Sequence, residues 1–142
     1  CTIFYQAKIR IVVKERFIMS YRVLLADDAG FIRQILISIC SEAGHLVVGE
    51  AVNGQEAIDL CRQRKPQIIL LDLIMPELNG VEAAEKILAM NPELYIVAVS
   101  SADEPFILQQ SFAAGCRDFL KKPFTKEDVL AVFNRYKKSS HV

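Results

Sequence analysis

Residues 68–80 read IILLDLIMPELNG, and the type of fold follows from this stretch and from its recurrence along the chain. The stretch opens with an apolar run, residues 68–71, which ends at Asp72, and the turn-forming residues Pro76 and Gly80 come next. A short apolar run between polar and turn-forming residues is typical of a buried β-strand. The sequence therefore predicts a strand that ends with a carboxylate, then a loop, then a helix.

Similar apolar runs recur along the chain, with amphipathic segments between them. Apolar residues at helical spacing, such as Phe31, Ile35 and Ile39, identify these segments as helices. The expected strands are residues 23–26, 46–51, 68–71, 95–99 and 117–120, and the expected helices are residues 31–43, 53–64, 81–90, 103–114 and a last one that opens at residue 125. Five strands alternating with five helices predict an α/β protein whose doubly wound parallel sheet is covered on both faces.

Local signals mark several helix ends. Gly44 stands where a helix C-cap belongs, and Asn53 is a typical N-cap. Thr125, with Asp128 three residues later, resembles a capping box at the start of the last helix. The polar residues 137–142 are expected to fray.

The composition limits the classes of function. Hydrophobic residues make up 52% of the chain and charged residues 24%, as in an ordinary globular protein. No apolar run approaches the roughly 20 residues that cross a bilayer, so we expect no membrane association. Residues 1–18 are basic, so the remainder of this chain of zero formal net charge is mildly acidic, and we expect no binding to nucleic acid. The four cysteines lack metal-binding spacing and predict a reducing, cytoplasmic location.

The N-terminal stretch does not fit the pattern of the rest. Residues 1–18 have short apolar groups broken by charges and lack the apolar centre of a secretory signal. We predict that they form a non-native or poorly ordered extension, that Met19 is the natural start, and that the domain comprises residues 19–142. The alternative is an additional strand or helix, since residues 8–13 could be extended.

Polar side chains follow four of the five expected strands. The first strand leads to Asp27 and Asp28, the third to Asp72, the fourth to Ser100 and the fifth to Lys122. In an open α/β sheet, ligands bind beyond the carboxyl ends of the strands. Carboxylates gathered there repel one another unless one is protonated or a cation lies among them, and an all-oxygen set suits Mg²⁺. A carboxylate beside such an ion can attack a phosphoryl group, while a lysine and a hydroxyl bind its oxygens.

Each of these residues also has a structural interpretation when it is taken alone. Asp27 and Asp28 could cap the first helix, and Asp72 could cap a loop. Lys122 could be a solvated surface lysine, and Ser100 could bond to its own backbone. Their joint occurrence, each at the matching strand end, favours the site.

Four motifs resemble those of the response regulator receiver domains of two-component signal transduction. The motifs are VLLADD at 23–28, IILLDLIMPELNG at 68–80, VAVSSAD at 97–103 and DFLKKPFT at 118–125. The resemblance implies a flavodoxin-like (β/α)5 fold with strand order 2-1-3-4-5. It also implies that Asp72 is the phosphoacceptor and that Mg²⁺ is held by Asp27, Asp28, Asp72 and the backbone carbonyl of Ile74. Lys122 would pair with the phosphoryl group.

The resemblance further implies a switch and a set of partners. Ser100 would bind a phosphoryl oxygen and move inward, Phe119 would be the switch aromatic, and the bond before Pro123 would be cis. The expected partners are a sensor histidine kinase or phosphotransfer protein and a downstream target protein, with the chain a monomer or weak dimer. The chain would be a phosphoacceptor signalling domain rather than an enzyme. Because Phe119 lacks a hydroxyl, an output that depends on a tyrosine hydrogen bond is in doubt.

The sequence admits three other interpretations of its function. An aspartate-nucleophile phosphatase needs a second Asp two residues after Asp72, where this chain has Ile74. A flavin carrier needs a phosphate loop, but Asp27 and Asp28 occupy that position. The third alternative is a receiver fragment of a longer regulator whose output domain is missing.

Overall fold

The computed structural model describes residues 20–101 and 105–140. The predicted extension at residues 1–18, the proposed start at Met19 and the expected helix start at 103 lie outside these ranges. Within them, no helix is both long enough and apolar enough to span a membrane.

The described elements form one parallel sheet with a helix after each strand. The strands are β1 (Arg22–Ala26), β2 (Leu46–Ala51), β3 (Ile68–Asp72), β4 (Tyr95–Ser101) and β5 (Asp118–Lys122); the helices are α2 (Gly30–Glu42), α3 (Gly54–Arg64), α4 (Gly80–Met90), α5 (Pro105–Ala114) and α6 (Lys126–Ser140). The strand order is β2-β1-β3-β4-β5, and every pairing is parallel. The predicted α/β fold class and its 2-1-3-4-5 order are confirmed.

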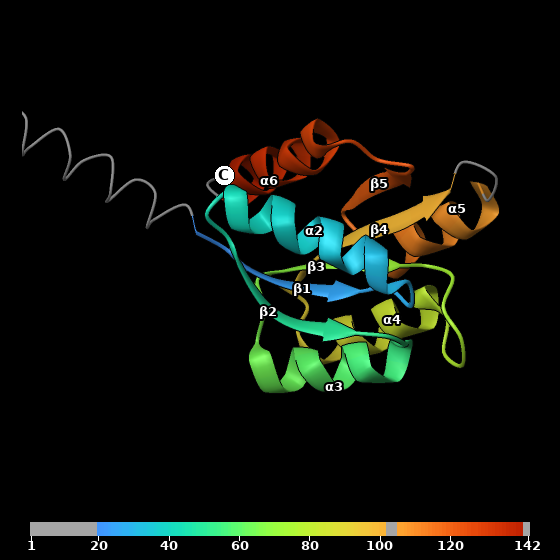
Figure 1. The fold of residues 1–142 in the computed structure, drawn as a ribbon. Helices are drawn as coiled ribbons and strands as arrows, with labels where there is room; N and C mark the ends of the chain where they lie inside the picture. Colours follow the sequence, from blue (N-terminus) through green and yellow to red (C-terminus); the bar gives the residue numbers. More distant parts are fainter. Residues whose placement is uncertain (1–19, 102–104, 141–142) are drawn as a thin grey trace, which may run out of the picture.

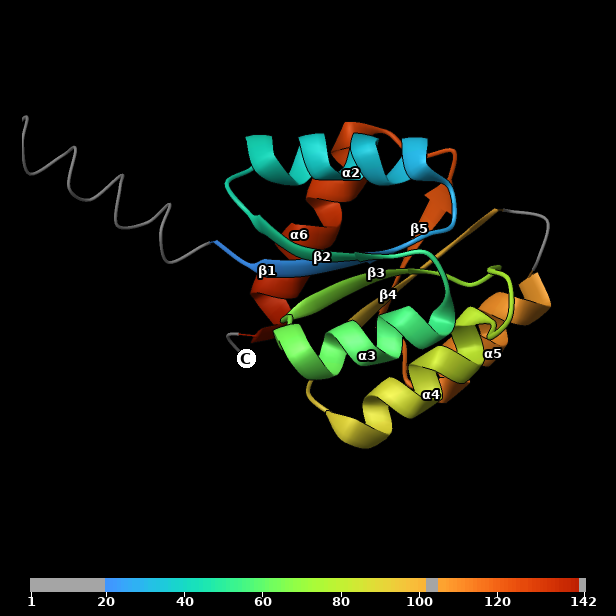
Figure 2. The same ribbon diagram turned by 60° about the horizontal axis from the view of Figure 1, so that its bottom comes forward.

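The helices cover the sheet in two layers, with α2 and α6 on one face and α3, α4 and α5 on the other (Figures 1 and 2). Alternate side chains of each strand point to opposite faces, so each face has its own core. Leu24 and Ala26 of β1 belong to the core under α3 and α4, whereas Val23 and Leu25 belong to the core under α2 and α6. All four are almost fully buried, which explains the uninterrupted apolar runs of the sequence.

Several element boundaries differ from the predicted ranges by one or two residues, and tertiary contacts explain the differences at β5 and at the last helix. Strand β5 reaches Lys122 rather than residue 120, because Lys121 and Lys122 pair with the last residues of β4. The last helix continues to Ser140 although its end was expected to fray. Its Tyr136 ring packs edge-on against Tyr21 and Tyr95, at centroid distances of 4.7 and 5.1 Å, which fixes that turn to the sheet.

The predicted caps are present. The Asn53 side chain accepts from the backbone N–H of Glu56 at 2.8 Å. Gly44 has φ +84°, just beyond the end of α2, where a residue without a Cβ is favoured. Thr125 and Asp128 form both reciprocal bonds of a capping box, at 2.9 and 3.1 Å.

Gly80 lets α4 begin directly against the end of β3. A Cβ at this position would lie 2.5 Å from the carbonyl oxygen of Asp72 and 2.5 Å from the Cα of Leu73. The Gly80 N–H donates to the Leu73 carbonyl at 3.0 Å. The helix start and the backbone of Asp72 are therefore packed without room for a methyl group.

We expect Gly80→Ala to lower the free energy of unfolding by at least about 2 kcal/mol, because overpacking against a backbone cannot be relieved by a side-chain rotation. Urea denaturation measures the change. The matched control is Gly30→Ala, at the start of α2, where the added Cβ would meet only the Arg33 Nη2 atom at 3.6 Å. Equal stability of the Gly80→Ala variant and the wild type would contradict the packing described here.

Candidate functional site

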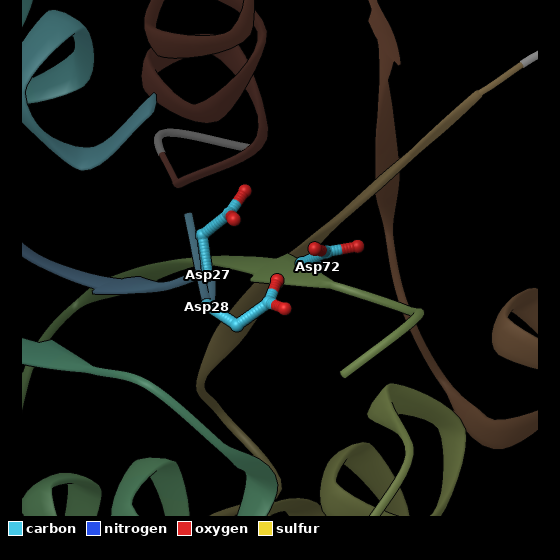
Figure 3. A group of neighbouring side chains, drawn as sticks. All are labelled: Asp27, Asp28 and Asp72. Atoms are coloured by element: carbon cyan, nitrogen blue, oxygen red, sulfur yellow. The ribbon is translucent and has the colours of Figure 1, made fainter. Parts of the chain in front are cut away.

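Three carboxylates meet at the carboxyl edge of the sheet, as Figure 3 shows. Asp27 and Asp28 follow β1 and Asp72 ends β3, and because β1 and β3 are parallel neighbours their ends coincide. One oxygen of each carboxylate lies within 4.8 Å of one oxygen of the other two. Asp27 and Asp72 are buried, whereas Asp28 is exposed. The site is thus a compact anionic cluster with one side open to solvent.

Lys122 supplies a positive charge to this cluster from the end of β5. Its Nζ lies 2.8 Å from Asp27 Oδ2 and 3.2 Å from Asp72 Oδ2. The ammonium therefore bridges the two buried carboxylates. Because one cation faces three carboxylates, the cluster keeps an excess of negative charge.

The pKa values of the bridged groups reflect this balance. Burial raises the pKa of Asp72, and the nearby charge of Asp27 adds to the rise, although the Ile74 N–H and Lys122 oppose it. Burial acts to lower the pKa of Lys122, but its hydrogen bond to Asp27 and the charge of Asp72 outweigh burial and raise it. The Lys122 ammonium therefore stays protonated, while burial opposes ionisation of the Asp72 carboxyl group.

Local backbone bonds orient both buried carboxylates in the same way. Asp27 Oδ1 accepts from the N–H of Ala29 at 2.8 Å, and Asp72 Oδ1 accepts from the N–H of Ile74 at 3.0 Å. In each case the acceptor is two residues before the donor, as in an Asx-turn. The Oδ2 atoms are left to point at Lys122.

The other predicted site residues lie on β4, on β5 and in the loops beside them. Ser100 is buried on β4, one residue beyond the partner of Asp72, and its hydroxyl donates to the Ser101 carbonyl at 3.4 Å. Phe119 is half-buried on β5. The Lys122–Pro123 peptide bond is cis. Ile74 is 48% exposed beside Asp72, with its N–H in the bond described above.

Arg33 and Glu50 were not predicted as part of this region. Arg33 Nη1 donates to the backbone carbonyl of Asp27 at 2.7 Å, and its Nε donates to Glu50 Oε1 at 3.0 Å. In the sequence, Arg33 lies between the apolar residues that mark the first helix. Their spacing does not indicate where its long side chain extends.

The donor set fits Mg²⁺. The carboxylates offer hard oxygen ligands, and Asp28 is open to solvent, as an ion that retains several waters requires. With three carboxylates facing the single ammonium of Lys122, the cluster has room for a further positive charge. Asp27, Asp28 and Asp72 could hold the ion together.

Comparisons with known proteins agree on one family. The family model described as the response regulator receiver domain matches residues 23–134. The chemotaxis protein CheY of Thermotoga maritima is 38% identical over 120 residues, which cover 84% of this chain and 100% of that protein. The transcriptional regulatory protein PdtaR of Mycobacterium tuberculosis is 35% identical over 111 residues, which cover 77% of this chain and 53% of that protein. Among solved structures, the response regulator domain of Thermotoga maritima CheB superposes with a TM-score of 0.74 at 32% identity, and the match covers 82% of this chain and 95% of that one.

We expect Asp72→Asn to be more stable than the wild type at pH 7 without Mg²⁺, by about 1 kcal/mol, the ordinary size of a single-residue effect, because it removes a charge whose burial is unfavourable while Lys122 keeps Asp27 as its partner. The native pKa of Asp72 lies above its ordinary value of 3.8, so the folded state binds more protons than the unfolded state between these two pKa values. Wild-type stability therefore falls as pH rises through the native pKa. The advantage of the variant should vanish below about pH 3.8.

Urea denaturation in the presence of a chelator, at several pH values, measures this difference. The control is Asp59→Asn, which alters an aspartate on α3 paired with Arg62 at the surface, at 3.6 Å. It should change stability by less than about 0.5 kcal/mol. A less stable Asp72→Asn protein at pH 7 would show that Lys122 more than compensates the buried charge.

Proposed function

Because this chain belongs to the response regulator receiver domain family, we propose that it accepts a phosphoryl group on Asp72 and thereby switches a protein-binding surface. Members of this family are phosphoacceptor signalling domains of two-component systems. The observation that carries the proposal is the position of Asp72, whose buried carboxylate contacts Lys122 and lies beside Asp27 and Asp28 at the open edge of the sheet.

The proposed reaction is a transfer from a phosphohistidine of a sensor histidine kinase or of a phosphotransfer protein. Asp72 Oδ2 attacks the phosphorus, a new P–O bond forms, and the P–N bond breaks, so that the histidine leaves as a neutral imidazole after taking up a proton. The Ile74 N–H holds Oδ1 and thereby fixes the orientation of the attacking carboxylate. Lys122 transfers its bond from Asp72 Oδ2 to a phosphoryl oxygen and neutralises part of the added charge.

Mg²⁺ would be held by Asp27, Asp28 and Asp72, together with the backbone carbonyl of Ile74. When bound, it offsets the negative charge on the oxygens of the transferring group. Asp27 and Asp28 contribute by holding the ion beside Asp72 rather than by reacting themselves.

The switch would act through β4 and β5. Within residues 20–101 and 105–140, the hydrogen bond of the Ser100 hydroxyl is a long one, at 3.4 Å, so this hydroxyl is available to bind a phosphoryl oxygen and move toward Asp72. Phe119, half-buried on the neighbouring strand, would turn inward into the space that Ser100 leaves. We assign target binding to the face of α5, β5 and α6, where α5 carries no charged residue and exposes 68% of Phe106 and 45% of Phe112.

A second candidate is the receiver part of a longer regulator. The match with PdtaR covers only 53% of that protein, so this kind of domain also occurs joined to further sequence. In that case the same face would contact an output domain of the same polypeptide. The intact mass of the protein isolated from its source gives its length and distinguishes a single receiver domain from a longer regulator.

We expect incubation with Mg²⁺ and acetyl phosphate to add the mass of one phosphoryl group to the chain, because the carboxylate of Asp72 can attack an activated small-molecule donor as well as a protein. Intact mass spectrometry detects the adduct. It should be absent from Asp72→Ala and from the wild type in the presence of a chelator. The matched control Asp59→Asn should be phosphorylated like the wild type.

Phosphorylation of the Asp72→Ala variant at wild-type yield would place the acceptor elsewhere. No adduct on the wild type under any Mg²⁺ concentration would mean that the chain acts without phosphorylation.

A further inference from the structure

We propose that Arg33 and Glu50 form a positioning pair that holds the backbone of Asp27 in place for Mg²⁺ binding. This inference rests on the proposed function, because it concerns the same acidic cluster. It assigns a role to two residues that are neither ligands nor reacting groups.

The pair joins three elements at the edge of the site. Arg33 lies in the first turns of α2, and its guanidinium donates to the Asp27 carbonyl at 2.7 Å and to Glu50 Oε1 at 3.0 Å. Glu50 is on β2, the edge strand next to β1. The side chains are 17% and 38% exposed, so the bonds are partly shielded from water.

The Asp27 peptide is thereby held from both sides. Its N–H donates to the Ala51 carbonyl of β2 at 3.0 Å, and its carbonyl accepts from Arg33. Strand β1 ends at Ala26, so beyond the Asp27 N–H the pairing with β2 no longer fixes the backbone. Repulsion among the carboxylates acts on this turn, and among the described residues Arg33 is the hydrogen-bond donor to the Asp27 carbonyl. Outer contacts of this kind orient metal ligands and tune their affinity.

Charge and position predict opposite effects of removing Arg33. As a bare cation near the cluster, Arg33 would repel Mg²⁺, and its removal would tighten Mg²⁺ binding. As a positioning group, it keeps the Asp27–Asp28 turn in the geometry that the ion needs, and its removal weakens binding. Glu50 at 3.0 Å offsets much of the guanidinium charge, which favours the positional role.

The experiment measures Mg²⁺ affinity by isothermal titration calorimetry on the full chain. We expect the Kd for Mg²⁺ to rise about tenfold in Arg33→Gln, the lower end of the effect of outer-shell substitutions. Arg33→Lys should lie between this variant and the wild type, because one ammonium cannot reproduce the planar fork that reaches both partners. The rate of phosphorylation by acetyl phosphate should fall at limiting Mg²⁺ and return to within about twofold of the wild type at saturating Mg²⁺.

The matched control is Lys126→Gln, which removes another ion pair made by α2, that of Lys126 with Glu42 at 2.6 Å. This pair lies at the other end of the helix from Arg33, so Mg²⁺ affinity should be unchanged while any general effect of loosening α2 would appear. Circular dichroism and urea denaturation establish that each variant is folded.

Wild-type or tighter Mg²⁺ binding by folded Arg33→Gln overturns the inference. If that variant does not fold, Arg33→Lys decides, since it keeps the positive charge and loses the planar fork that reaches both partners. We expect it to weaken Mg²⁺ binding severalfold, and an unchanged Kd in Arg33→Lys overturns the inference. A wild type that binds Mg²⁺ but never gains a phosphoryl group would refute the proposed function and leave the positioning role standing.

Discussion

Mutual repulsion among three carboxylates at one edge of the sheet is the constraint to which the surrounding structure responds. Strands β1 and β3 are parallel neighbours, so the fold itself brings Asp27, Asp28 and Asp72 together and cannot separate them. The compensation comes from Lys122 on β5, which is two strands away from β3 and reaches the cluster through the length of its side chain. The distance between β5 and β3 therefore determines whether the Lys122 ammonium can reach the carboxylates.

This arrangement links the charge state of the cluster to the far edge of the sheet. Lys122 and Phe119 lie on the same strand, and Ser100 on the strand beside it is the residue paired with Lys121. When Lys122 exchanges one binding partner for another, the contacts that fix the end of β5 therefore change as well. On the opposite side, Arg33 ties the Asp27 turn to β2, the other edge strand. The cluster is thus connected to one edge strand through Arg33 and Glu50 and to the other through Lys122.

The sequence allowed the strand ends to be predicted, because uninterrupted apolar runs mark strands buried on both faces and parallel strands end at one edge. These two rules were sufficient to predict that Asp27, Asp28, Asp72 and Lys122 lie together. The extent of β5 was missed because two lysines beside a proline suggest a loop, whereas their pairing with β4 depends on tertiary structure. Arg33 was missed for a related reason, since periodicity gives the side of a helix and not the direction of a long flexible side chain.

The sheet separates two cores that differ in the kinds of side chain they contain. Under α3, α4 and α5 the buried set is rich in alanine, and under α2 and α6 it includes the rings of Tyr21, Tyr95 and Phe133. Because the hydrogen-bonded backbone of the sheet lies between the two cores, substitutions in one core are separated from the other, and the effects of distant substitutions are additive. Over evolutionary time, each core can therefore accumulate substitutions with little compensation in the other.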